Sequence, residues 1–255
     1  MAQKYYVVWK GRETGIFTDW STCKKHIDHF PGARYKSFKT LSDAEGAFKG
    51  GSSSTKAGSS SKASPVKKKA GIKTYTANDI AEMAIDTKIY TDGGCEPNPG
   101  EAGSGVAVYR SDVIDELWYG LYNPKGTNNT AELNALHQAM MMAKDEMSQQ
   151  RSVAIFCDSK YSIQCVTQWA AGWEKKGWKK AGGEIKNLQL IQEMFALYQT
   201  IKGKIQVLHV NGHVGVEGNE LADRMSILAI ESGDSDFTRY REEIDIAAIL
   251  ATRAG

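Results

Sequence analysis

The stretch TKIYTDGG, residues 87–94, decides the fold of the larger part of this chain. Its apolar positions predict a strand that carries Asp92 within it. Residues 103–110 and 113–122 predict two more strands in succession. From Thr130 to Met147 the apolar positions recur every three or four residues, which predicts a helix.

The rest of this part alternates strand and helix. Residues 152–158, SVAIFCD, are almost wholly apolar, as expected of a buried central strand. Helical patterns follow over 161–173 and 187–201, then a strand over 204–210 and an amphipathic helix over 218–230. This order predicts an α/β fold with a mixed five-stranded sheet and flanking helices.

The composition excludes several classes of protein. The 255 residues carry a net charge of +2 and include no run of eighteen apolar residues, which predicts no membrane span. The first residues, MAQKYYVVWK, lack the apolar core of a secretion signal. The four cysteines form no CxxC pair, which favours reduced thiols in a cytoplasmic protein over structural zinc or disulfides.

The small net charge hides a division along the chain. Residues 1–74 hold 15 Lys and Arg against 5 Asp and Glu, whereas residues 75–255 hold 17 against 25. Such a basic segment predicts contact with a polyanion. Residues 50–70, rich in Gly, Ser and Lys, predict a flexible linker. The predicted parts are a module over 1–48, a linker over 49–74, a main domain over 75–233 and a tail of unassigned role over 234–255.

The N-terminal module is predicted to be a small α+β unit. KYYVVWKG and TGIFTDW predict a hairpin, and ARYKSF predicts a third strand. STCKKHIDHF predicts a helix capped by Ser21 or Asp19, and LSDAEGAF predicts a closing helical turn capped by Ser42.

Four acids lie where loose surface acids are not expected: Asp92, Glu132, Asp158 and Asp223. Their ordinary alternatives are, in that order, a turn former, a helix-dipole partner, a helix N-cap and a solvated helix acid. An acid at the end of a buried strand is costly unless a cation or hydrogen bonds compensate its charge. Four oxygen donors without a paired His and Cys set favour Mg²⁺ or Mn²⁺ over zinc.

Four motifs, YTDGGCEPNPG, TNNTAEL, FCDSKY and HVNGHVGVEGNELAD, occur in the order and spacing of type 1 ribonuclease H. The chain resembles that family over residues 86–230, which implies a ribonuclease H-like fold. The resemblance also implies that the four acids hold two Mg²⁺ ions with Asp92 as the shared ligand, that His213 moves protons or helps product leave, and that Asn219 lies near the metals. The implied reaction hydrolyses RNA in RNA/DNA hybrids and leaves 5′-phosphate and 3′-hydroxyl ends.

The resemblance implies substrate contacts as well. Only the 2′-hydroxyl distinguishes RNA from DNA at a fixed backbone position. The positions that match its readers are Cys95, Asn98, Asn128 and Glu132, and Thr127 with Asn98 matches part of a DNA-phosphate pocket. An ordinary turn at Asn98 and a helix cap at Thr127 are the alternatives.

The segment TQWAAGWEKKGWKKAGG resembles the basic protrusion with which some members grip the duplex. This resemblance implies contacts from Trp169, Lys175 and Lys176. Trp169 and Trp173 share a helix face, so both are also expected to pack partly in the core.

The N-terminal module resembles the hybrid-binding, viroplasmin-like domain found before some ribonuclease H domains, through YYVVWKGRETGIFTDW, FPGARYKSF and AEGAF. The resemblance implies that Trp20 and Tyr35 lie under the DNA strand, that Lys36 contacts a phosphate and that Tyr6 lies on the RNA side. Ser37 stands where the family often has a basic residue, which implies a weaker grip on DNA.

These inferences predict an endoribonuclease that acts on RNA/DNA hybrids, as a monomer without an obligate protein partner. Three alternatives stay open: a non-catalytic hybrid-binding protein, the nuclease domain of a reverse-transcribing element, and a DNA-strand transferase of the same fold. The presence of all four acids disfavours the first, and the length of 255 residues, too short for a polymerase, disfavours the second. Cleavage of DNA-only duplexes would favour the third.

Overall fold

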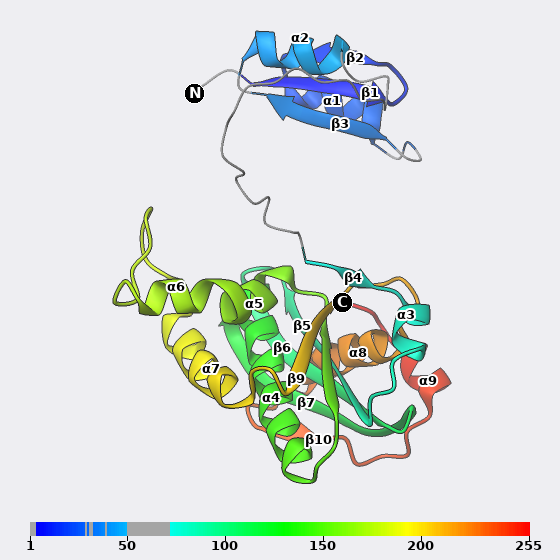
Figure 1. The fold of residues 1–255 in the computed structure, drawn as a ribbon. Coiled ribbons are helices and arrows are strands. Elements are labelled where there is room, and N and C mark those ends of the chain that lie inside the picture. Colours follow the sequence, from blue (N-terminus) through cyan, green and yellow to red (C-terminus); the bar gives the residue numbers. More distant parts are fainter. Residues whose placement is uncertain (1–3, 29, 31–32, 39, 50–71) are drawn as a thin grey trace. The chain divides into compact units, whose positions relative to one another are not determined.

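The computed structural model describes residues 4–28, 30, 33–38, 40–49 and 72–255. The chain divides into two compact units between residues 68 and 69 (Figure 1). The linker predicted over 50–70 lies outside the described residues. Its predicted limits at 49 and 74 are corrected, because a helix extends to Lys49 and Thr74 already belongs to a strand.

The N-terminal unit is a three-stranded antiparallel sheet with two helices, as expected of a small α+β unit. Its elements are β1 (Tyr5–Lys10), β2 (Gly15–Phe17), α1 (Trp20–Ile27), β3 (Arg34–Phe38) and α2 (Leu41–Lys49). Strand β1 lies between β2 and β3. Its Val8 packs against Cys23 and Ile27 of α1 to form the core of the unit.

Side-chain caps begin both helices of this unit. Asp19 rather than Ser21 caps α1, because its carboxylate accepts a hydrogen bond from a first-turn N–H at 2.7 Å. The prediction that Ser42 caps the second helix is wrong. The cap is Thr40, whose hydroxyl oxygen accepts from Asp43 N at 3.2 Å.

The larger unit is built on a seven-stranded mixed sheet. Its strands are β4 (Thr74–Tyr75), β5 (Thr87–Glu96), β6 (Gly100–Arg110), β7 (Val113–Gly126), β8 (Val153–Cys157), β9 (Ile205–Val210) and β10 (Phe237–Arg239). The five expected strands form its centre in the order β7-β6-β5-β8-β9. The short strands β10 and β4 extend it beyond β7 and β9, which corrects the predicted number of strands.

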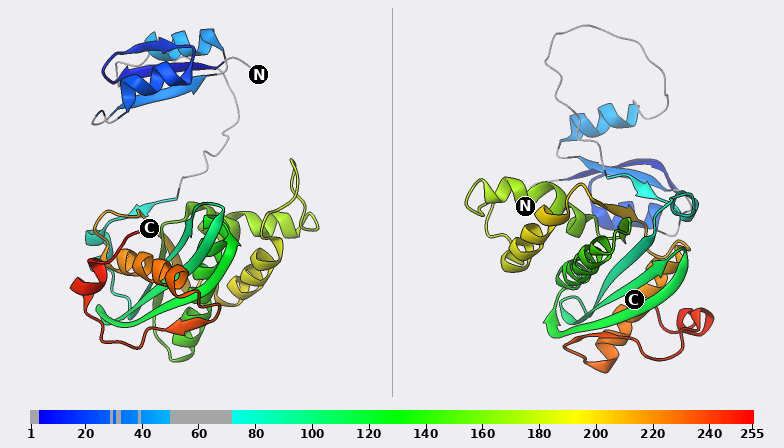
Figure 2. Two further views of the ribbon diagram at one scale, coloured as in Figure 1. Left: turned by 180° about the vertical axis from the view of Figure 1, so that it is seen from behind. Right: turned by 60° about the horizontal axis from the view of Figure 1, so that its bottom comes forward.

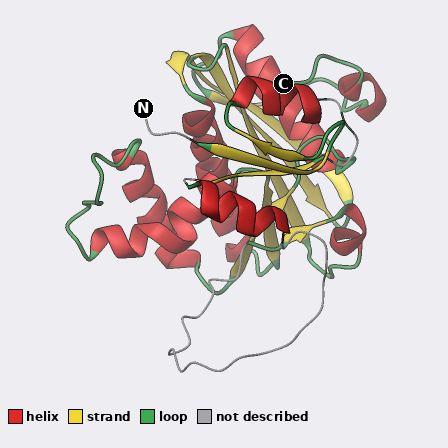
Figure 3. Cartoon of the chain, turned by 90° about the horizontal axis from the view of Figure 1, so that it is seen from above, coloured by secondary structure: helices red, strands yellow, loops and turns green. Residues whose placement is uncertain are grey.

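Helices cover both faces of this sheet (Figures 2 and 3). They are α3 (Ala77–Ala81), α4 (Asn128–Ser148), α5 (Lys160–Gln164), the π-helical turn η1 (Cys165–Trp169), α6 (Ala170–Glu174), α7 (Leu188–Ile201), α8 (Glu217–Ser232) and α9 (Ile246–Leu250). One core packs α4 and α7 against the sheet, and the other packs α3, α8 and α9. Neighbouring strand residues alternate between them, with Ile89 in the first core and Tyr90 in the second.

Two segments differ from their predicted form. The single helix predicted over 161–173 is divided into α5, η1 and α6. The tail over 234–255 is part of the unit, because it contains the edge strand β10 and the helix α9. None of the helices in the described ranges has both the length and the apolar character that a membrane span needs.

Candidate active site

Two of the predicted acids meet at one end of the sheet. Strands β5 and β8 run parallel, with Thr91 opposite Cys157. Asp92 and Asp158 are the next residues along the two strands, so the register brings them to the same edge. Asp158 does not cap the following helix, since Ser159 Oγ accepts the hydrogen bond from Ser162 N at 3.3 Å.

Helix α4 brings Glu132 to the same edge. The helix begins at Thr127, whose hydroxyl oxygen accepts from Thr130 N at 3.2 Å. It lies so close to β5 that a Cβ atom at Gly93 would be 2.7 Å from Glu132 Cα and nearer still to Glu132 N. A glycine at position 93 therefore permits the approach that places Glu132 beside the strand of Asp92.

Helix α8 supplies the fourth acid. It packs tightly on β6, since a Cβ atom at Gly105 would lie 2.5 Å from Ser226 N. Asp223, three residues before Ser226, is buried. All four acids line one cleft of about 500 Å³ together with His213.

The carboxylates of the cleft destabilise one another in their charged form. Burial, followed by the charges of Asp158 and Asp223, holds the pKa of Asp92 well above its usual value. Burial, followed by the charges of Asp92 and Asp158, does the same for the pKa of Glu132. Burial also raises the pKa of Asp158, against the opposing effects of an Asn219 hydrogen bond and the charge of His213. A bound cation would offset all three effects.

The cleft also holds oxygen atoms that suit a hard cation. Glu132 Oε2, Asp158 Oδ1 and Asn219 Oδ1 are buried and have no hydrogen-bond partner within the described residues. Buried polar atoms of this kind are rare unless a ligand satisfies them. Glu132, Cys157 and Asp158 offer ligand atoms that all lie within 4.8 Å of one another. Burial raises the pKa of the Cys157 thiol, which leaves the oxygens as the available donors.

His213 and Asn219 approach the acids from the loop and helix that follow β9. His213 is exposed at the mouth of the cleft, with a left-handed φ of 54°. Asn219 is 2% exposed in the first turns of α8, and its side chain bonds Asp158. The structure thus brings both predicted residues to the four acids.

Sequence reasoning missed a residue that holds Asp158 in place. His209 of β9 is buried, and its Nε2 lies 3.1 Å from the main-chain oxygen of Asp158. A carbonyl oxygen only accepts, so Nε2 carries the proton and Nδ1 accepts from the Thr74 hydroxyl at 2.9 Å. This link depends on the parallel pairing of β4 with β9, which no local pattern reveals.

Sequence reasoning also missed the end of the tail. Arg253, Ala254 and Gly255 line the cleft beside the acids. The Gly255 main-chain N–H donates to Asp223 Oδ1 at 3.1 Å and to Oδ2 at 3.3 Å. No spacing within the tail could have indicated this contact.

Three of the four predicted readers of the 2′-hydroxyl line the cleft, and the fourth is bonded to one of them. Cys95, Asn128 and Glu132 line it, and the exposed Asn98 accepts a hydrogen bond from Asn128 N at 3.3 Å. Thr127 serves as the helix cap that was its ordinary alternative. Capping the helix is compatible with a substrate contact by Thr127, because this residue is partly exposed and its hydroxyl can accept a second hydrogen bond.

The tryptophan and lysine cluster divides into buried and exposed parts. Trp169 and Trp173 have ring centroids 5.8 Å apart and pack against the core that contains α4 and α7. Lys175 and Lys176 are exposed at the end of α6. The expectation that the two tryptophans belong partly to the core is confirmed, whereas the two lysine side chains are exposed to solvent.

The N-terminal unit gathers three of its four predicted contact residues. The Trp20 ring centroid lies 5.4 Å from that of Tyr6 and 5.8 Å from that of Tyr35. Trp20 is 44% exposed and Tyr35 is 48% exposed, so aromatic surface is open to a ligand. Lys36 points to the opposite side of β3, with its Nζ 5.6 Å from the Phe38 ring centroid.

The comparisons with known proteins agree with this geometry. The family model for RNase H matches residues 84–231, more than half of the chain. The chain belongs to the ribonuclease H family. As a ribonuclease H it is a nuclease that cleaves RNA in RNA/DNA hybrids. The model for the Ribonuclease H1 N-terminal domain matches residues 4–48, which confirms the predicted hybrid-binding domain ahead of a type 1 enzyme.

Two ribonucleases H are similar to this chain over different shares of its length. Mouse Ribonuclease H1 is 32% identical over 256 residues, covering 87% of each chain. The Acidovorax Ribonuclease H is 40% identical over 145 residues, which cover 56% of this chain and 93% of the relative.

Solved structures confirm the fold of the larger unit. The PFV RNase H domain superposes with a TM-score of 0.50 at 21% identity and covers 60% of this chain and 98% of its own. LC9-RNase H1 superposes with a TM-score of 0.50 at 24% identity and covers 64% and 84%. The ribonuclease H-like fold predicted from the sequence is therefore correct.

Proposed function

We propose that this ribonuclease H hydrolyses the RNA strand with two Mg²⁺ ions, for which Mn²⁺ can substitute, and releases 5′-phosphate and 3′-hydroxyl ends. The observation that carries the proposal is a cleft lined by four carboxylates. The pKa values of Asp92, Glu132 and Asp158 are raised there, and Glu132 and Asp158 each keep a buried oxygen without a hydrogen-bond partner among the described residues. Asp92, Glu132, Asp158 and Asp223, which line one cleft, would hold the ions, and Asp92 would be the ligand that both ions share. Two such ions, once bound, would supply the charge that activates a water and stabilises the leaving oxygen.

Other residues of the chain hold the acids in position and would bind the substrate. Asn219 fixes the Asp158 carboxylate, and His209 fixes the main chain of the same residue. His213 is exposed and lies close enough for its charge to act on Asp158, which suits a group that moves a proton or assists product release. Cys95, Asn98, Thr127 and Asn128 line or border the cleft, where they would contact the 2′-hydroxyls and the DNA phosphate.

Identifying which strand of a hybrid is cut tests this function. A hybrid with separately labelled RNA and DNA strands should lose only its RNA strand in Mg²⁺, and a chelator should stop the reaction. Products should carry 5′-phosphate and 3′-hydroxyl ends. Cleavage of the DNA strand or of a DNA-only duplex would support the strand-transferase alternative, and cleavage that persists in chelator would contradict the metal assignment.

We further propose that the N-terminal unit holds the hybrid through Tyr6, Trp20 and Tyr35. Trp20→Ala should weaken hybrid binding by about 1–3 kcal/mol, since aromatic stacking on sugars and bases is worth that much. Phe48→Ala is the matched control, because Phe48 is a partly exposed aromatic residue on α2, outside this trio. Fluorescence anisotropy with a labelled hybrid measures both, and equal losses in the two variants would contradict the proposed surface.

We also propose that the chain acts as a monomer in the cytoplasm. Helices of its own chain already cover both faces of the central sheet, and all four cysteines are free thiols, as suits a reducing compartment. Light scattering should give the mass of one chain, 28.0 kDa.

A further inference from the structure

The tail crosses the larger unit before it reaches the cleft. Strand β10 pairs antiparallel with β7, and Asp245 caps α9 by accepting a hydrogen bond from Ala248 N at 3.0 Å. Ile249 of α9 is buried in the core that includes Leu221 of α8. These anchors carry the chain from the sheet edge to Asp223 and Arg224 of α8.

The last residues of the tail form hydrogen bonds and an ion pair with residues of the active site. Gly255 N–H donates to both oxygens of the Asp223 carboxylate. The Arg253 guanidinium forms an ion pair with Glu96, at the end of the strand that carries Asp92. Arg224 forms an ion pair with Asp223 and donates to Leu250 O of the tail at 3.3 Å. The Asp223 carboxylate therefore forms an ion pair with Arg224 and accepts hydrogen bonds from the tail.

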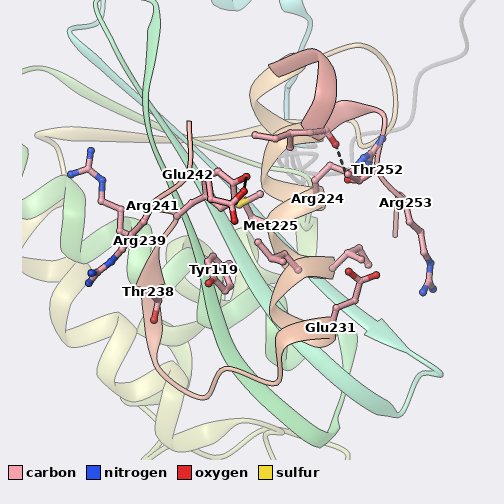
Figure 4. Close-up of a pocket in the computed structure, with 14 residues that line it drawn as sticks. Tyr119, Arg224, Met225, Glu231, Thr238, Arg239, Arg241, Glu242, Thr252 and Arg253 are labelled. Carbon is pink, nitrogen blue, oxygen red and sulfur yellow. Dashed lines mark hydrogen bonds between the residues drawn. The ribbon is translucent and has the colours of Figure 1, made fainter. Parts of the chain in front are cut away.

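The contact of the tail with α8 is incomplete. A pocket of about 370 Å³ lies between them, with Arg224, Met225 and Glu231 of α8 on one side and residues 238–242 of the tail on the other (Figure 4). The buried arginine atom Arg224 Nε has no hydrogen-bond partner among the described residues. Residues 251–255, beyond α9, are all exposed, and a segment that buries so little opens at a smaller free-energy cost than the core does.

We propose that residues 252–255 form an autoinhibitory contact, in which the tail competes with a divalent cation for the Asp223 carboxylate. The inference rests on the proposed metal role of Asp223. A carboxylate that accepts the Gly255 N–H at both oxygens has fewer lone pairs for a metal. The ion pair of Arg253 with Glu96 holds the tail against the cleft that the proposed function assigns to the substrate. Metal and hybrid would displace residues 252–255 together, while β10 and α9 stay in place.

The full-length variant Gly255→Pro tests the contact. Proline lacks the donating N–H, and even a Cβ atom at this position would lie 2.7 Å from Asp223 Oδ1. Titration calorimetry with Mn²⁺ in the absence of hybrid should show binding about threefold to tenfold tighter than in the unchanged protein, because a closed fraction no longer reduces the apparent affinity. Arg253→Ala should act in the same direction. The Mg²⁺ concentration for half-maximal cleavage should fall in parallel.

Arg241→Ala is the matched control, since Arg241 lies on the same tail but lines the pocket on α8 and not the cleft. It should leave metal binding unchanged. If a variant loses thermal stability, a chain shortened by residues 252–255 replaces it, because α9 then keeps its buried Ile249. Metal binding that is unchanged or weaker in Gly255→Pro and in the shortened chain would overturn the inference while leaving the proposed function intact. An unchanged protein that binds no Mn²⁺ and cleaves in chelator would overturn the proposed function itself.

Discussion

An Asp92→Asn variant is expected to bind RNA/DNA hybrid as the unchanged protein does and to cleave it at least about 10³-fold more slowly. Asparagine keeps the shape of the side chain but lacks the charge that a shared metal ligand needs. Single-turnover cleavage and binding by anisotropy separate the two effects. Full activity in this variant would overturn the metal assignment.

The same substitution should raise the thermal midpoint in chelator at neutral pH. The pKa of Asp92 is raised in the folded protein above its ordinary value of 3.8, so the folded state binds the proton more tightly than the unfolded state does. The free energy of unfolding therefore falls as pH rises from about 4 through the folded pKa. An asparagine cannot ionise and avoids this loss. Asp145→Asn, on the exposed side of α4, is the control, and a lower midpoint in Asp92→Asn would contradict the electrostatic account.

Gly93→Ala is expected to cost about 3 kcal/mol of stability and most of the activity. The added methyl group would collide with the main chain of Ala131 and Glu132. A backbone cannot turn aside as a flexible side chain can, so β5 and α4 must separate, and Asp92 must separate from Glu132. Urea unfolding measures the loss.

Gly172→Ala provides the comparison for this substitution. Gly172 lies in α6, and a Cβ atom there would have no neighbour within 4 Å. Alanine favours helix over glycine, so this change should be neutral or slightly stabilising. Equal losses of stability in Gly93→Ala and Gly172→Ala would contradict the role of the close approach between Gly93 and α4.

Local patterns were enough to predict the central strands and most helices. The apolar run of β8 and the spacing of Leu133, Leu136 and Met140 in α4 each reflect one buried face, and a buried face leaves a periodic trace in the sequence. Two of the acids, Asp92 and Asp158, were found for a related reason, because a charge within or directly after an apolar strand is conspicuous. Their grouping came from the motifs, and the structure adds the strand register and the close approach at Gly93.

Other features could not be predicted because they depend on residues far apart in the chain. His209 is linked to Thr74 only through the pairing of β4 with β9. Gly255 reaches Asp223 only because β10 and α9 direct the tail. At short range, the prediction of Ser42 as helix cap failed because the helix begins at Leu41, and the hydroxyl that accepts from Asp43 N belongs to Thr40.

The short strand β10 has a consequence for how this protein behaves at high concentration. Without it, β7 would be an edge strand of fourteen residues, Val113–Gly126, with a row of free N–H and C=O groups. Such edges invite pairing with a second chain and lead to aggregation. Strand β10 covers the stretch from Trp118 to Gly120, in the middle of that row. The tail thus keeps the sheet from extending from one molecule into the next, whatever the state of its last four residues.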